Sequence, residues 1–100
     1  MYIIFGSKKD VYESTPMDGI EIVEKYLYKF YNEVKLELNI ARVDDENCKI
    51  KVTDCVDKKY INYISAKFFG NFRDANEARK EIEELIFYGN LETELEKIFL

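Results

Sequence analysis

The acidic side chains near the C-terminus are the residues whose type and spacing are best suited to a chemical task. Glu77, Glu81 and Glu84 follow one another at intervals of four and three residues, which places them on one face of a helix. The chain has no His, and its carboxylates form no recognisable catalytic pair. The spacing therefore favours an electronegative surface that binds a basic partner rather than a reaction.

The distribution of charge supports the same interpretation. Positions 71–100 hold eight acidic and four basic side chains, whereas the first seventy positions hold twelve acids and eleven bases, so most of the net charge of −5 is local. Such acids are also typical of a solvated helix face that keeps a small protein soluble, and this alternative stays open. If the surface is functional, Tyr88 is a candidate aromatic anchor. The predicted partner-binding residues are Glu77, Glu81, Glu84, Tyr88, Glu92 and Glu96.

These acids must be positioned by a folded core, and the N-terminal pattern begins it. Tyr2–Phe5 is a run of β-forming residues that predicts a short first strand. Thr15 is a suitable helix cap, and Pro16 follows it at the first helical position, where its missing N–H costs nothing. We therefore expect a first helix after Thr15. Its core residues would be Ile20, Val23, Leu27, Phe30 and Tyr31.

The hydrophobic period then changes to two residues, which is typical of strands. Apolar and polar residues alternate over Val34–Ile40 and again over Cys48–Thr53, with the polar turn 44–47 between them. This predicts a β-hairpin with one wet face. Tyr60–Phe69 predicts a third antiparallel strand, which completes a meander.

The last thirty residues predict two helices. Asp74 and Glu77 form a capping pair, and Gly89 with Asn90 separates the first helix from the second. The predicted core residues are Ala75, Ala78, Ile82, Leu85 and Ile86 in the first helix and Leu91, Leu95, Ile98 and Phe99 in the second. The expected fold is a single compact α+β domain over residues 1–100, with a short N-terminal strand, a helix, a three-stranded antiparallel meander and two C-terminal helices (β-α-β-β-β-α-α).

Metal and cofactor sites are not indicated. The acidic run 44–47, even with Asp54 and Asp57, does not match a calcium-binding loop. Cys48 and Cys55 have neither zinc nor redox spacing, and we expect reduced thiols. The glycines form no phosphate-binding loop, and no Ser or Cys stands in a nucleophile motif. We predict that the protein is not an enzyme and uses no cofactor.

Two other binding modes remain as alternatives. Aromatic residues flanked by lysines could present a sheet surface for single-stranded nucleic acid, although the acidic pI of about 4.8 argues against it. Exposed aromatics and the apolar C-terminus could instead form a homodimer. The residues of the nucleic-acid alternative are Lys49, Lys51, Lys58, Lys59, Lys67 and Arg73 with Tyr60, Tyr63, Phe69 and Phe72.

A small, acidic, His-free and aromatic-rich chain with this predicted architecture resembles phage-encoded inhibitors of bacterial defence systems, anti-CRISPR proteins among them, and is similar in kind to toxin-immunity proteins. The resemblance implies an inhibitor that occupies a basic surface of a nuclease or other nucleic-acid-handling protein. No apolar segment approaches the length needed to cross a bilayer, and no secretory signal pattern is present, so we expect no membrane partner and a cytoplasmic location.

Overall fold

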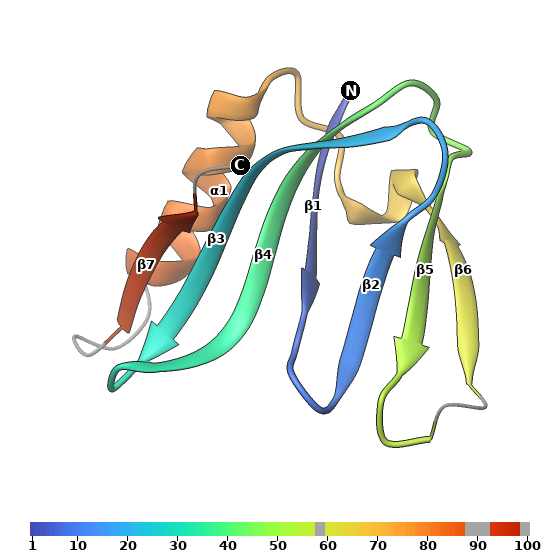
Figure 1. The fold of residues 1–100 in the computed structure, drawn as a ribbon. Coiled ribbons are helices and arrows are strands. Elements are labelled where there is room, and N and C mark those ends of the chain that lie inside the picture. Colours follow the sequence, from blue (N-terminus) through green and yellow to red (C-terminus); the bar gives the residue numbers. More distant parts are fainter. Residues whose placement is uncertain (58–59, 88–92, 99–100) are drawn as a thin grey trace.

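The computed structural model describes residues 1–57, 60–87 and 93–98 and contains seven strands, a short 3₁₀ helix and one α-helix within those ranges (Figure 1). In chain order the elements are β1 (Tyr2–Ser7), β2 (Tyr12–Pro16), β3 (Ile20–Phe30), β4 (Glu33–Val43), β5 (Lys49–Asp54), β6 (Ile61–Ser65), η1 (Ala66–Phe69), α1 (Ala75–Phe87) and β7 (Thr93–Ile98).

The strands form two antiparallel sheets. The first sheet has the strand order β1-β4-β3-β7 and the second has the order β2-β5-β6. In Figure 1 the sheets stand side by side, with β1 of the first next to β2 of the second. These two strands are not paired along their length, because only an isolated bridge joins Lys8 to Tyr12. The sheets therefore separate at the β1–β2 hairpin.

The first sheet contributes to two cores, because successive side chains of a strand point to opposite faces. One face packs against the second sheet and η1, and the other face packs against α1. The buried residues of the first core are Ile3, Phe5, Ala41, Val43, Ile50 and Ala66, and those of the second are Tyr26, Leu38, Ile40, Ala78 and Ile82. The first sheet is thus the middle layer between α1 and the second sheet.

The predicted α+β class and its order β-α-β-β-β-α-α are wrong. The described chain is mostly antiparallel β and has one α-helix. No helix in the described ranges is long and apolar enough to cross a bilayer.

The expected first helix is strand β3. Gly19 has φ of 86°, a conformation that does not occur inside a right-handed helix, and it makes a turn between β2 and β3. A β-bulge between Ile22 and Glu24 shifts the faces of this strand. Ile20 and Ile22 pack toward the second sheet, whereas Tyr26, also at an even position, packs toward α1. Because both faces of β3 are covered and the bulge interrupts the alternation, the apolar residues show no plain two-residue period.

The predicted hairpin and meander are also wrong in their pairing. The strands expected at Val34–Ile40 and Cys48–Thr53 exist as β4 and β5, but they belong to different sheets. β4 pairs with β1 and β3, and β5 pairs with β2 and β6. The third strand ends at Ser65 and is followed by η1, so its pairing with β5 is right and its length was overestimated.

The expected second C-terminal helix is strand β7. Glu94, Leu95 and Glu96 alternate between the two faces of the sheet, and Leu95 packs against the core beneath α1. Pairing with the edge of β3 decided the conformation of a segment whose local pattern suits both structures. The predicted core positions Leu91 and Phe99 lie outside the described residues.

The first strand and the first C-terminal helix are confirmed as elements. α1 begins after Asp74, and Ala78 and Ile82 are fully buried in the second core. The predicted core position Leu85 is wrong, because its side chain is 59 % exposed. The core assignment of Ile86 lies outside what the structure describes.

Candidate functional site

The exposed carboxylates of α1 lie on the side of the helix away from the sheet. We call Glu77, Glu81 and Glu84 the acidic strip. Glu81 and Glu84 are exposed, as is Glu83 beside them. Within the described ranges none of these three enters an ion pair. The carboxylate charge of α1 is therefore open to a partner at these positions.

Glu77, the first residue of the strip, is already engaged. Its Oε2 accepts a hydrogen bond from the Nε of Arg73 at 3.0 Å. Its backbone N–H donates to Oδ1 of Asp74 at 2.8 Å, which is the helix cap expected from the sequence. Arg73 thus offsets part of the charge at the start of the strip, and Glu81 and Glu84 dominate its electrostatic field.

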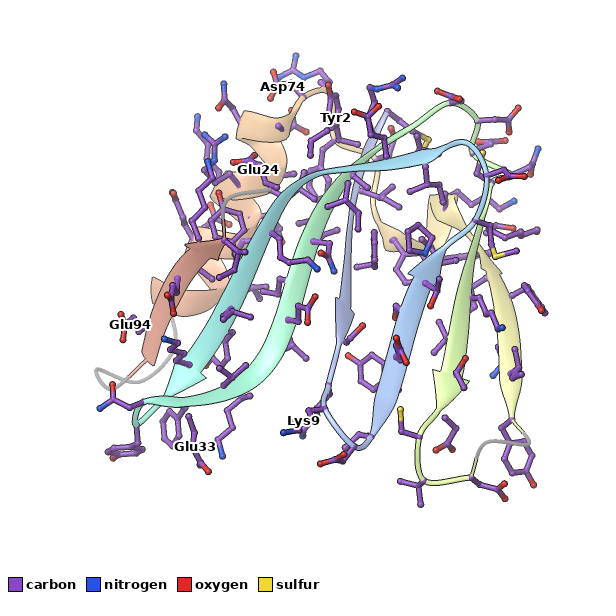
Figure 2. All side chains as sticks on the ribbon, viewed as in Figure 1. Tyr2, Lys9, Glu24, Glu33, Asp74 and Glu94 are labelled. Atoms are coloured by element: carbon purple, nitrogen blue, oxygen red, sulfur yellow. The ribbon has the colours of Figure 1, made fainter. Side chains whose placement is uncertain are left out.

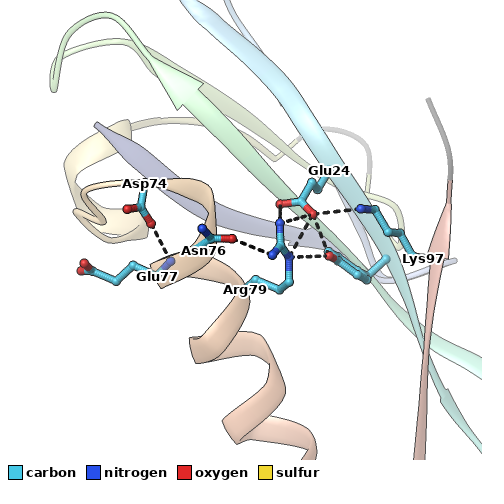
Figure 3. A network of polar contacts seen from close by, with 7 residues as sticks. Glu24, Asp74, Asn76, Glu77, Arg79 and Lys97 are labelled. Atoms are coloured by element: carbon cyan, nitrogen blue, oxygen red, sulfur yellow. Dashed lines mark hydrogen bonds and ion pairs between the residues drawn. The ribbon is translucent and has the colours of Figure 1, made fainter.

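A buried carboxylate of β3 joins α1 to the first sheet (Figure 3). Glu24 is only 7 % exposed, and its two oxygens accept hydrogen bonds from Nη2 of Arg79 at 2.8 and 2.9 Å. The Nε of Arg79 lies 3.1 Å from Oε1, and the hydroxyl of Tyr26 donates to the same oxygen at 2.9 Å. The Nζ of Lys97 on β7 lies 3.2 Å from it. One carboxylate therefore connects β3, β7 and α1.

The environment of this network sets its protonation. Burial raises the pKa of Glu24, but hydrogen bonds from Tyr26, Arg79 and Lys97 outweigh that effect, so the pKa lies below its ordinary value. Burial and the hydrogen bond to Glu24 raise the pKa of Tyr26. At neutral pH the site therefore holds a charged carboxylate and a neutral phenol. Because an Arg bound to both oxygens of a carboxylate is geometrically specific, the contact fixes the orientation of α1 and of its acidic strip.

Only part of the predicted site comes together. Glu77, Glu81 and Glu84 share α1, whereas Tyr88 and Glu92 lie outside the described residues. Glu96 lies on β7, where it forms an ion pair with Lys29. Since Leu95 faces α1, Glu96 points to the opposite face of the sheet. The structure therefore separates Glu96 from the acidic strip.

The anchoring residues Glu24 and Arg79 were not found from the sequence. β3 holds four charged residues, and nothing in their spacing distinguishes Glu24, because the bulge changes the face that an alternating pattern assigns to it. Arg79 is one of the four basic side chains at positions 71–100, and nothing in its spacing indicates a buried partner. Their pairing spans 55 residues of sequence, and no local pattern reports such a contact.

The sheet face considered for nucleic acid is smaller than expected. Lys51 pairs with Tyr63 across the outward face of the second sheet, and Lys49 donates to Ser65 Oγ at 2.7 Å. Phe69 and Phe72 pack against the two cores instead of lying on this face. Lys58 and Lys59 lie outside the described residues. On this face Tyr63 lies beside Lys49 and Lys51, and Tyr60, just before β6, is 64 % exposed. Lys67 and Arg73 are exposed but lie outside the second sheet, in η1 and in the segment before α1.

The polar turn and the cysteines add no further site. Asp45 Oδ1 accepts the N–H of Asn47 at 2.7 Å, which accounts for the turn, and Arg42 binds Asp44 at 3.1 Å. In the described part of the chain, no three His, Cys, Asp or Glu side chains gather as metal ligands. Cys48 and Cys55 are both free thiols.

Comparison of the chain with protein-family models, curated proteins and solved structures found no match.

Proposed function

We propose that this chain acts by binding another protein through the acidic strip of α1. The observation that supports it is an exposed pair of carboxylates, Glu81 and Glu84, on a helix held in one orientation by the buried contact between Glu24 and Arg79. A charged surface that is already ordered loses little conformational entropy when it binds, so more of its electrostatic attraction to a basic partner appears as binding free energy.

The partner that best fits this surface is a nuclease or other nucleic-acid-handling protein, with the chain as its inhibitor. Such proteins carry basic surfaces that ordinarily hold phosphate groups, and carboxylates on a rigid helix can occupy the same positions. We propose a cytoplasmic location, where such enzymes act and where thiols such as Cys48 and Cys55 stay reduced. Of the resemblance to anti-CRISPR and immunity proteins, size, acidity and composition remain as support, because the predicted architecture is wrong.

The experiment is affinity capture from a bacterial lysate at low salt, followed by elution at rising salt and mass spectrometry. The test variant carries Glu81→Lys and Glu84→Lys, and the matched control carries Asp18→Lys and Glu46→Lys at exposed turn positions. Each substitution adds two charges, so both variants change from −5 to −1. Comparison of the two variants therefore separates the position of the charge from its amount.

We expect wild type and the control to retain one basic protein that leaves as salt rises, and the test variant to lose it. Purified target should then be inhibited by wild type and by the control alone. Retention of the same partner by the test variant would exclude the acidic strip as the binding surface.

A homo-oligomeric module is the second candidate, and the edge strand β6 favours it. Ile61 and Tyr63 point outward from this edge and are 43 % and 57 % exposed. An exposed edge with apolar side chains can pair with the same edge of a second copy. Sedimentation of wild type and Tyr63→Lys over a range of concentrations tests this: a wild-type dimer that the substitution dissociates supports it, and a monomer throughout excludes it.

A further inference from the structure

A cleft lies between the β1–β2 hairpin and the face of the first sheet opposite α1. Its volume is about 580 Å³, within the range of roughly 300–1,000 Å³ that is usual for small-molecule sites. β1, the hairpin turn and β2 line one side, and β3 and β4 line the other. Phe5, Pro16 and Ile22 supply apolar wall. The splaying of the two sheets at the hairpin therefore leaves a site of ligand size.

Asn39 of β4 gives the cleft an unsatisfied polar wall. The residue lines the cleft, lies between Phe5 and Lys25 in the strand register and is only 3 % exposed. Its Oδ1 is buried and has no hydrogen-bond partner in the structure. A buried acceptor without a donor destabilises the folded chain, and such groups are rare in native proteins unless they serve a purpose. The oxygen has almost no accessible surface in this conformation, and a rotation of the side-chain amide that brings it to the cleft surface would let a ligand N–H satisfy it.

The lining of the cleft carries a small surplus of cations although the protein is acidic. The lining holds four lysines (Lys8, Lys9, Lys25 and Lys35) and three acids (Asp10, Glu13 and Glu37), a balance of +1 in a chain of −5. Lys25 is paired with Glu37 at 2.8 Å, and Lys35 with Glu33 at 2.8 Å. Lys8 and Lys9 enter no ion pair among residues 1–57, 60–87 and 93–98. Lys9 stands near the tip of the hairpin (Figure 2), and both lysines belong to the turn that lines one side of the cleft.

We propose that this cleft binds a mononucleotide, with an N–H of the base donating to Asn39 Oδ1 and the phosphate bound at Lys8 and Lys9. The three features of the cleft correspond to three features of this ligand class: apolar walls for the faces of a ring, a buried acceptor for an N–H edge, and unpaired cations for an anion. Apolar ligands leave Asn39 unsatisfied, and a simple anion does not reach it. This site is separate from the acidic strip, because the two lie on opposite faces of the first sheet.

The test is a titration of the full-length, ¹⁵N-labelled protein with AMP, GMP, CMP and UMP, with adenosine and inorganic phosphate as comparison ligands. We expect at least one nucleotide to shift the side-chain amide signals of Asn39 and the backbone signals of Lys8 and Lys9. Adenosine should bind more weakly and with less dependence on salt, because it lacks the phosphate. Phosphate alone should affect only the lysines.

Asn39→Leu removes the polar group at similar volume and should weaken nucleotide binding at least about tenfold. Because it also removes an unsatisfied buried acceptor, it should not lower the melting temperature. Asn71→Leu, at an exposed position outside the cleft, is the matched control and should leave both unchanged. The surface variant Lys8→Glu with Lys9→Glu should weaken binding by a similar factor and tests the phosphate contact without altering the core.

Three outcomes would overturn the proposal. One is that no nucleotide shifts the Asn39 amide at millimolar concentration. Another is that phosphate alone reproduces every shift, which would indicate an adventitious anion only. The third is that the Lys8 and Lys9 double variant binds nucleotide as tightly as wild type.

Discussion

Replacing Arg79 with Met should destabilise the protein by removing the main partner of a buried charge. The substitution removes the guanidinium and keeps an apolar side chain over the sheet. Glu24 would retain the hydroxyl of Tyr26 and the ammonium of Lys97, and would lose all of its bonds to Arg79. A carboxylate that is 7 % exposed cannot recover those bonds from water without a local opening of the structure.

The magnitude follows from the burial of the two partners. Removal of one member of a buried ion pair costs about 3–5 kcal/mol. The side chain of Arg79 is 35 % exposed and that of Glu24 is 8 % exposed, so solvent screening reduces the loss. The remaining contacts reduce it further, and we expect about 2 kcal/mol. With a urea m-value of about 1.5 kcal/mol/M, the unfolding midpoint should fall by about 1.3 M.

Urea unfolding at neutral pH, followed by circular dichroism, measures this change. Arg73→Met is the matched control on the same segment, because Arg73 is 90 % exposed and its ion pair with Glu77 should be worth less than about 0.5 kcal/mol. A double-mutant cycle of Arg79→Met with Glu24→Gln isolates the coupling between the two side chains. Equal losses for the Arg79 and Arg73 variants, or a coupling energy of zero, would refute the reasoning.

Three further predictions concern pH, the helix cap and the core. Folding lowers the pKa of Glu24 from 4.5, so the stability that this carboxylate contributes is present above pH 4.5 and is lost as the pH falls through the folded pKa. Below pH 4.5 the melting temperature of wild type should therefore decline more than that of Glu24→Gln. Parallel curves for the two proteins would contradict this. Asp74→Ala removes the side-chain acceptor of the Glu77 N–H in the first turn of α1 and should cost about 1 kcal/mol in urea unfolding. An unchanged midpoint would show that the cap contributes nothing. Ile40→Ala removes a side chain with 0 % exposure between α1 and the sheet and should lower the free energy of unfolding by about 2–5 kcal/mol. Leu85→Ala, at 59 % exposure, should lower it by less than about 0.5 kcal/mol. Similar losses of stability at the two positions would contradict this assignment of the core.

The helix α1 illustrates what local sequence can predict. Asp74 caps it, and Ala78 and Ile82 bury one face, as their types and spacing indicate. The exposure of Glu81 and Glu84 follows from the same periodicity, so the central part of the acidic strip was predictable. These features depend on residues within a few turns of one another, which is the range over which sequence patterns act.

Strand β3 illustrates where local patterns fail. Its apolar residues show no plain two-residue period, because both faces are covered and a bulge at Val23 shifts the alternation. The choice of strand came from partners far along the chain, since Ile22 is paired with Ala41 and Tyr28 with Leu95. β7 was misassigned for the same reason, because an edge that needs a hydrogen-bonding partner can impose β structure on a segment whose own preference is ambiguous.

Side-chain type and short-range spacing are enough to place the β-forming segments at β1, β4, β5 and β6, the helix α1 and the local concentration of acids. The assembled fold fixed which strands pair, separated Glu96 from the acidic strip and brought Glu24 to Arg79 across 55 residues. It also decided that Asn39, on a strand face expected to be wet, lies buried beside a cleft. The physical reason is that burial and pairing are properties of the assembled layers, and the free energy that selects them comes from contacts between segments that are distant in the chain.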